Sequence, residues 1–214
     1  LASSAASDVY KRQVDHLPIV GVTSNPSIVK KTSPKDFFGH MREIRKIIGD
    51  ERSLHIQVIA TEADEIVKEA HKIFEEVDDK VYVKVPTTYE GVKAMKILKA
   101  EGKNVTATAV YDLMQAYMAL AAGADYIEVG FLDDRREFDI NRSIMPSTEA
   151  INKIFGSVKK GKAIPVAMID FGTCSLDSIG SCDSTFIDGI RVIFKNCLLY
   201  TSLSPRDTER SRMP

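Results

Sequence analysis

The stretch VYVKVP at residues 81–86 places a lysine, Lys84, inside a run of β-branched and apolar residues. Short runs of this kind form the buried strands of parallel sheets. Lysine is seldom fully buried, because burial disfavours its charged form and lowers its pKa. A lysine near a strand end can also extend its ammonium group to solvent. A neutral lysine in an apolar pocket, by contrast, attacks carbonyl carbons and forms Schiff bases. Residues 81–86 alone leave both interpretations open.

Strand and helix patterns alternate along the chain. Strands are predicted at residues 19–23, 54–60, 81–86, 104–110, 126–129, 164–168 and 185–187. Apolar stripes of helical period separate them, and Ser33 and Thr61 are expected to cap the first two helices. Such alternation predicts a parallel sheet covered by helices. Seven strands are one short of a (β/α)8 TIM barrel, the fold class that we predict. A doubly wound open sheet is the alternative, but the chain has no GxGxxG or GxxxxGK phosphate loop.

The composition suits one globular domain and argues against several classes of function. The chain has 214 residues, of which 44% are hydrophobic and 28% charged, and its net charge is −1. No basic excess points to nucleic acid, and no apolar run approaches the roughly 20 residues of a membrane helix. The three cysteines show no metal-ligand spacing. We therefore expect no metal, no other cofactor and no nucleic-acid or membrane partner. A cytoplasmic location is also expected.

Both ends of the chain carry a pattern that points to a non-native origin. Residues 8–13 (DVYKRQ) and 197–202 (CLLYTS) can be back-translated into DNA strings that are reverse complements apart from single-base overhangs. Both strings resemble the translation of a transposase-end adapter used in sequencing libraries. We therefore expect residues 1–13 and 197–214 to be adapter-like and residues 14–196 to be the natural domain. That domain is expected to lack its native first strand and its C-terminal helix.

Polar residues recur once per strand–helix unit. Asn25 follows the first predicted strand, Gln57 lies in the second, Lys84 in the third and Thr108 in the fourth. In a β/α barrel, catalytic groups come from the ends of several strands and converge on one face. Each residue also has a structural explanation, as a turn residue, a satisfied core amide or a good strand former. Their common register with Lys84 favours a site.

Four segments carry a resemblance to a known family. They are GVTSNPSI (21–28), HIQVIAT (55–61), VYVKVPTTYEGVKAMKILKAEG (81–102) and TATAVYDLMQAYMALAAGADYI (106–127). These segments are similar to the fructose-6-phosphate aldolase and small transaldolase family, and the resemblance covers about half of the chain. It implies a (β/α)8 barrel and a metal-free, class I aldol reaction.

The resemblance also implies a role for individual residues. Lys84 matches the lysine that forms a Schiff base with a donor such as dihydroxyacetone or fructose 6-phosphate, after which the C3–C4 bond breaks. Gln57 and Thr108 match residues that hold a catalytic water beside this lysine. Asn25 matches a residue that binds the donor's hydroxyls, and Ser27 of the same Asn-Pro-Ser motif is assigned to the substrate. Because transaldolases typically carry glutamate where this chain has Gln57, we favour aldolase and keep transaldolase as the alternative.

The chain departs from the family pattern in three places. The family's opening strand carries an aspartate, and Asp8 is out of step with it. After the motif ADYI the family tyrosine has no clear equivalent, since Phe131 lacks a hydroxyl, and Arg135 matches the phosphate-binding arginine only loosely. Asp170 falls beside the family's phosphate-binding serine and would repel a phosphate. These departures predict either a preference for unphosphorylated donors or local frameshifts.

Members of the family form pentamers and decamers, so the parent protein is expected to be a homo-oligomer that acts on a small sugar or sugar phosphate.

Two further hypotheses belong to other classes. The chain itself can instead be a non-catalytic barrel fragment, in which case exposed apolar surface should promote aggregation. The third hypothesis is a phosphosugar-binding or isomerase barrel without covalent chemistry. That reaction needs a carboxylate base at a strand end, for which Glu128 is the candidate.

Overall fold

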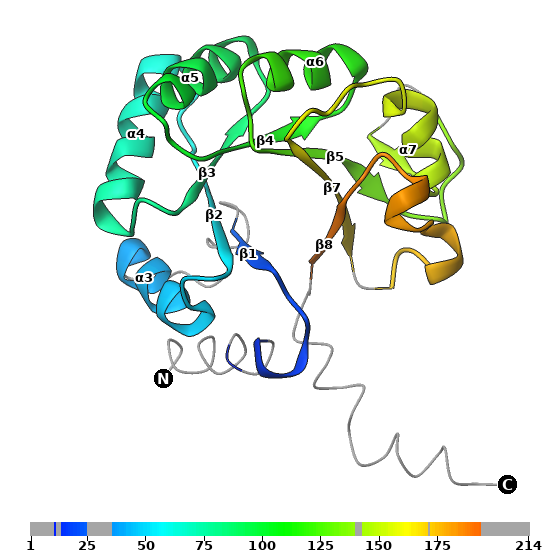
Figure 1. The fold of residues 1–214 in the computed structure, drawn as a ribbon, viewed down its shortest axis with the longest axis horizontal. Coiled ribbons are helices and arrows are strands. Elements are labelled where there is room, and N and C mark those ends of the chain that lie inside the picture. The colour runs from blue at the N-terminus through cyan, green and yellow to red at the C-terminus, as the bar shows by residue number, and fades with distance from the viewer. Residues whose placement is uncertain (1–10, 12–13, 25–35, 140–142, 171, 194–214) are drawn as a thin grey trace, which may run out of the picture.

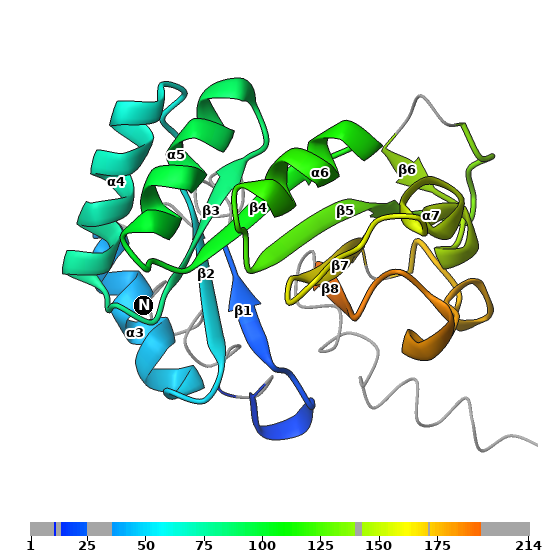
Figure 2. The ribbon, with the colours of Figure 1, turned by 45° about the horizontal axis from the view of Figure 1, so that its top comes forward.

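Parallel strands form one curled sheet that is open along one side (Figures 1 and 2). The computed structural model describes residue 11 and residues 14–24, 36–139, 143–170 and 172–193. Within these residues the strand order is β1-β2-β3-β4-β5-β7-β8, with β6 paired to β5, and every pairing is parallel. The strands are β1 (Gly21–Thr23), β2 (Ser53–Gln57), β3 (Tyr82–Pro86), β4 (Val105–Val110), β5 (Tyr126–Leu132), β6 (Ile144–Met145), β7 (Ile164–Asp170) and β8 (Gly189–Ile193).

Helices cover the outer side of this sheet (Figure 1). They are α3 (Phe37–Ile48), α4 (Ala63–Glu76), α5 (Tyr89–Ala100), α6 (Leu113–Ala121) and α7 (Thr148–Phe155), followed by the short 3-10 helices η1 (Leu176–Ser178) and η2 (Cys182–Ser184). In α4 the buried residues Ile66, Ala70 and Ile73 recur at helical spacing and form the stripe that faces the sheet. This is the arrangement of an incomplete (β/α)8 barrel, so the predicted fold class is confirmed. No helix in the described part of the chain has the length and apolar character needed to span a bilayer.

The helices begin at side-chain caps that differ in part from those predicted. Helix α3 begins at Phe37, because the Asp36 carboxylate accepts a hydrogen bond from the Gly39 amide at 2.8 Å. The predicted cap, Ser33, lies outside the described residues. The cap of α4 is Glu62 rather than Thr61, and its side chain makes no capping hydrogen bond.

The two faces of the sheet have different chemistry. On the outer face, residues such as Val83, Val105 and Ile127 are fully buried beneath the helices. The inner face follows from the strand register, since paired residues of parallel strands point to the same side. Lys84 is level with Gln57 on one neighbour and with Thr106 on the other. The polar residues of the central strands therefore lie together on the concave side.

One predicted strand is wrong. Residues 185–187 were expected to form the last strand, but they precede it, and β8 runs from Gly189 to Ile193. The Asp188 amide donates to the Pro165 carbonyl at 2.8 Å, and the pairing of β8 with β7 starts at the next residue. The shift matters because β8 carries Arg191 into register with Met168 on the inner face.

His55 anchors a lower layer of the inner face, one inward-facing position before Gln57. Its ring nitrogens lie 2.7 Å from Thr106 Oγ1 and 2.8 Å from Ser53 Oγ. The ring stacks on Tyr82 with 4.8 Å between centroids. Burial lowers the pKa of His55 to about 3, so the imidazole is neutral at physiological pH. A neutral histidine with a partner on each ring nitrogen is a poor proton acceptor.

Gly91 fixes the start of α5 against the end of β3. A Cβ atom at this position would lie 1.9 Å from the carbonyl oxygen of Pro86. A helical glycine-to-alanine change normally stabilises by up to ~1 kcal/mol. Here we expect Gly91→Ala to destabilise the protein by about 2 kcal/mol or more, because backbone must move. Urea unfolding measures the effect. The exposed substitution Lys93→Ala on the same helix is the control, and a Gly91→Ala variant as stable as the parent contradicts the packing.

Candidate active site

Lys84 lies on the inner face of β3 and is one of the most deeply buried side chains in the protein, with 1% of its surface exposed. The side chain is held between β2 and β4, the two strands that pair with β3. Within the described residues its Nζ atom has no hydrogen-bond partner of good geometry. Of the two interpretations that the sequence left open for Lys84, the one in which its ammonium group extends to solvent is therefore wrong.

A carboxylate from β5 faces this amine. Glu128 Oε1 lies 3.0 Å from Lys84 Nζ, and the Glu128 side chain is 3% exposed. The contact meets the distance of an ion pair but not the angles of a hydrogen bond. Arg191 Nη1 on β8 donates to the same Oε1 at 2.9 Å. Thr108 Oγ1 on β4 donates to Oε2 at 2.5 Å. Four strands thus bring two cations, one carboxylate and a hydroxyl together in the core.

The pKa values in this cluster follow from burial and from the neighbouring charges. Burial lowers the pKa of Lys84 to about 8, although Glu128 acts in the opposite direction. Arg191 lowers the pKa of Lys84 further. Burial alone would raise the pKa of Glu128, but the charges of Lys84 and Arg191 outweigh it, so this pKa lies below its ordinary value. Near neutral pH the carboxylate is ionised and a useful fraction of Lys84 is neutral.

Two strand irregularities lie beside Thr108 and Glu128. The pairing of β4 with β5 shifts between Ala107 and Val110, where Ala109 has a left-handed φ of 58°. The pairing of β5 with β7 shifts after Glu128, where Gly130 has a φ of 73°. A left-handed alanine costs about 1 kcal/mol or more, and β-bulges of this kind cluster beside active sites.

The predicted site residues are brought together only in part. Thr108 joins the Lys84 cluster through Glu128. Gln57 pairs in register with Lys84 and lies on the same face. Asn25 and Ser27 lie outside the described residues, although Ser24, the residue before them, donates its amide to the His55 carbonyl at 2.8 Å beside the end of β1.

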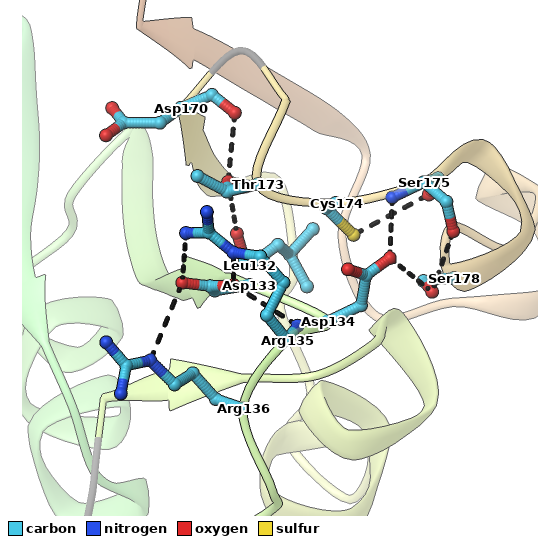
Figure 3. A network of polar contacts seen from close by, with 10 residues as sticks. All are labelled: Leu132, Asp133, Asp134, Arg135, Arg136, Asp170, Thr173, Cys174, Ser175 and Ser178. Carbon is cyan, nitrogen blue, oxygen red and sulfur yellow. Dashed lines mark hydrogen bonds and ion pairs between the residues drawn. The ribbon is translucent and has the colours of Figure 1, made fainter.

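Arg135 belongs to a separate network at the carboxyl ends of β5 and β7 (Figure 3). Its guanidinium makes two hydrogen bonds to Asp133, at 2.7 and 2.8 Å, which lower the pKa of that carboxyl. Asp134 accepts from the Ser175 amide at 2.6 Å and thereby ties the loop after β5 to the loop after β7. Asp170 is the last residue of β7. Arg135 thus already has a carboxylate partner, and its assignment to a substrate phosphate stays a prediction.

Sequence reasoning missed Arg191 and gave Glu128 a place only in the non-covalent hypothesis. Arg191 carried the same signal as Lys84, a lone cation in the apolar run GIRVI at residues 189–193. The misplaced last strand hid this signal. Within the described residues no group of three or more histidine, cysteine, aspartate or glutamate side chains is arranged to hold a metal ion.

The chain is similar to known proteins over more than half of its length. Residues 4–130 match the family model described as transaldolase/fructose-6-phosphate aldolase, a range that covers more than half of the chain and includes Lys84 and Glu128. The match begins at residue 4, within the segment 1–13 that we expect to be adapter-like, so the start of the natural domain at residue 14 stays a prediction.

Curated relatives carry the two activities in their names. A probable fructose-6-phosphate aldolase from Streptococcus pneumoniae (strain ATCC 700669 / Spain 23F-1) is 43% identical over 120 residues, 56% of this chain and 54% of that protein. A probable transaldolase from Methanococcus maripaludis (strain C7 / ATCC BAA-1331) is 40% identical over 116 residues, 53% of this chain and 52% of that protein. A probable transaldolase from Geotalea uraniireducens (strain Rf4) is 34% identical over 161 residues, 74% of this chain and 71% of that protein. The chain spans about half the length of the first two relatives.

Solved structures agree on the fold. Orotidine 5'-monophosphate decarboxylase from Methanocaldococcus jannaschii superimposes with a TM-score of 0.56 at 14% identity, over 98% of this chain and 90% of that chain. A structure titled "Native KDPGal structure" gives a TM-score of 0.56 at 11% identity, over 88% of this chain and 76% of that chain. At this identity the likeness concerns the fold alone. The family match, the identity to the curated relatives and the buried lysine on β3 together lead to one conclusion: this chain belongs to the transaldolase/fructose-6-phosphate aldolase family.

Proposed function

We propose that the protein is a class I aldolase in which Lys84 forms a Schiff base with the ketone of a dihydroxyacetone-type donor. In the cleavage direction the substrate is fructose 6-phosphate or a related ketose. A base takes the proton of the C4 hydroxyl, the electron pair of the C3–C4 bond moves to the protonated Schiff base, an aldehyde leaves, and the donor remains on Lys84 as an enamine. Protonation of the enamine and hydrolysis then release the donor.

The observation that carries this proposal is the buried amine of Lys84. Its pKa of about 8 keeps part of the amine neutral near neutral pH, which is the form that attacks a carbonyl. Buried donors without hydrogen-bond partners are costly and therefore uncommon. Lys84 Nζ and Arg191 Nη2 are two such donors within the described residues. Both side chains contact Glu128. The oxygens of a bound ketose would accept hydrogen bonds from these two nitrogen atoms.

Transaldolase activity is the second candidate. Both reactions form the same enamine. In the aldolase reaction the enamine is protonated, whereas in the transaldolase reaction it attacks a second aldehyde. The names of the Methanococcus and Geotalea relatives favour it, whereas the amide at Gln57 favours aldolase. Rates with and without an acceptor such as erythrose 4-phosphate separate the two reactions.

The direct test is to trap the Schiff base. The protein is incubated with dihydroxyacetone, reduced with borohydride, and analysed by intact-mass spectrometry and peptide mapping. We expect one adduct, on Lys84. Because Nζ is enclosed, an adduct also requires that the surrounding side chains open to admit a three-carbon ketone. Folded protein that gives no adduct would instead support the non-catalytic barrel fragment.

The rate of adduct formation should depend on pH in a defined way. The charged groups that face Lys84 are Glu128 from β5 and Arg191 from β8, while His55 from β2 is neutral. Because only the neutral amine attacks, the rate should rise about tenfold per pH unit below the pKa of about 8 and level off above it. Quenching aliquots with borohydride between pH 6 and 10 gives the profile. A rate that still rises steeply at pH 10 would contradict the lowered pKa.

A further inference from the structure

Glu128 lies close enough to the nitrogen atom of Lys84 to exchange a proton with it. Its Oε1 atom is 3.0 Å from Lys84 Nζ, within the distance over which a proton passes directly between two groups. The angles at the two atoms nevertheless fall outside those of a hydrogen bond. The amine is thus within reach of a base and remains available to a third group.

The position of the Glu128 carboxylate is fixed from two sides. Arg191 Nη1 holds Oε1 at 2.9 Å from β8, and Thr108 Oγ1 holds Oε2 from β4. Arg191 is itself largely buried, with 9% of its side chain exposed. A structural ion pair for Lys84 would need one carboxylate and no second cation. The additional buried arginine is costly in energy, so its presence needs another explanation.

We propose that Glu128 is the proton-transfer group of Schiff-base formation at Lys84, and that Arg191 is the residue that positions it. This proposal rests on the proposed function. It gives Glu128 a catalytic role within the covalent mechanism rather than the role of an isomerase base.

The proton transfers balance over the whole sequence. Glu128 first takes a proton from the Lys84 ammonium group, and the free amine attacks the ketone carbon, forming the C–N bond. The carbonyl oxygen takes the proton from Glu128 and becomes a hydroxyl. The new ammonium nitrogen returns a proton to Glu128, which passes it to that hydroxyl as the C–O bond breaks. Water leaves, the nitrogen electron pair forms the C=N bond, and Glu128 is again ionised beside the protonated Schiff base.

Arg191 changes the pKa of both groups that exchange the proton. Its charge lowers the pKa of Lys84, which favours loss of a proton from the ammonium group. It also lowers the pKa of Glu128, so that this carboxyl gives up the transferred proton readily in the next step. The groups that face Glu128 are Lys84 from β3, Thr108 from β4, Arg191 from β8 and the neutral His55 from β2.

The test is the rate of borohydride-trapped adduct in a Glu128→Gln variant at pH 7. The amide has a similar volume and its oxygen can still accept from Arg191, so this variant should lose less stability than one with alanine at the same position. Loss of proton transfer should slow adduct formation about 100-fold or more, with the same final yield after long incubation. A purely electrostatic role predicts the opposite sign. Because Glu128 raises the pKa of Lys84, removing its charge would leave more neutral amine and speed the reaction. A rate equal to or above the parent's would overturn the proposal.

Three further variants keep the test decisive. Glu101→Gln, on an exposed glutamate that pairs with His71, is the matched control and should leave the rate unchanged. If Glu128→Gln does not fold, Glu128→Asp retains the charge but withdraws it from Nζ by one methylene, and it should also be slow. Arg191→Met should move the pH profile of the rate to higher pH, because the charge that lowers the pKa of Lys84 is lost. Arg191→Lys keeps a positive charge and should move the profile less. An unmoved profile would show that Arg191 is only structural.

The outcomes separate this proposal from the proposed function. If the parent protein gives no adduct at Lys84, the proposed function fails and the role of Glu128 fails with it. If the parent is labelled at Lys84 and Glu128→Gln is labelled as fast, the aldolase assignment stands and only the role of Glu128 is refuted.

Discussion

A Lys84→Met variant is expected to lose every trace of the dihydroxyacetone adduct and to lose aldol turnover by on the order of 10³-fold or more. Methionine fills a similar volume but has no amine, so the covalent mechanism is removed while the packing remains. Glu128 keeps its bond to Arg191 in this variant. Because Arg191 still pairs with Glu128, the substitution leaves no buried charge without a partner, and the cost of breaking a buried ion pair is largely avoided. The thermal midpoint should therefore stay within a few degrees of the parent's.

The measurement pairs intact-mass spectrometry with a thermal melt. Lys80→Met is the matched control, since that side chain is 64% exposed and lies in the segment just before β3. The control should be labelled at Lys84 like the parent. Labelling or turnover at the parent's level in a folded Lys84→Met variant would refute the assignment of the nucleophile.

A Glu128→Ala variant should show the largest loss of stability. It removes the carboxylate that both Lys84 and Arg191 contact, and so leaves two cations in the core. Breaking a buried ion pair by removing one partner costs about 3–5 kcal/mol. The free energy of unfolding in urea gives the value. Glu101→Ala, whose side chain is 38% exposed, should change it by less than about 1 kcal/mol.

The pH dependence of this loss has a definite sign. Burial already places the pKa of Lys84 below 10.5, and without Glu128 it falls further. The folded variant then binds fewer protons than the unfolded chain, so its stability rises as the pH increases toward 10.5. The double variant Lys84→Met/Glu128→Ala should recover part of the stability at neutral pH. No recovery would mean that Glu128 stabilises the core by packing rather than by charge.

The fold was largely predictable from the sequence, because the spacing of apolar residues along the chain indicates which side chains are buried. The lysine in VYVKVP, the apolar stripes and the turn residues are local signals, and the helices and central strands follow them. The last strand was misplaced because Thr185–Ile187 has β-forming residues but lies in the turn that leads into Gly189–Ile193. Local preference cannot tell a strand from the loop that precedes it when both are short and apolar.

The site was predictable only where it depends on strand membership. Lys84 and Thr108 were placed on the correct face by their position in their own strands. Which carboxylate meets the lysine depends on the pairing of β4 with β5 and of β7 with β8. These pairings join segments that are distant in the sequence, so no local pattern of residues reports them. Glu128 and Arg191 could therefore be recognised as unusual residues, but their meeting could not be foreseen.

The bond between Glu128 and Arg191 joins residues 63 positions apart, whereas the pairings among the central strands join neighbouring strand–helix units. Contacts between distant residues form late when a chain folds, because their loop-closure entropy is lost before they contribute. The charge cluster is then complete only when β8 docks onto β7. Synthesis from the ribosome or partial refolding would then yield compact, helix-rich molecules in which Lys84 is present but the bond between Glu128 and Arg191 has not formed. Under the proposed mechanism, activity would appear only at the last step of folding. An activity assay would then report fully folded molecules, whereas circular dichroism would also report the partly folded ones.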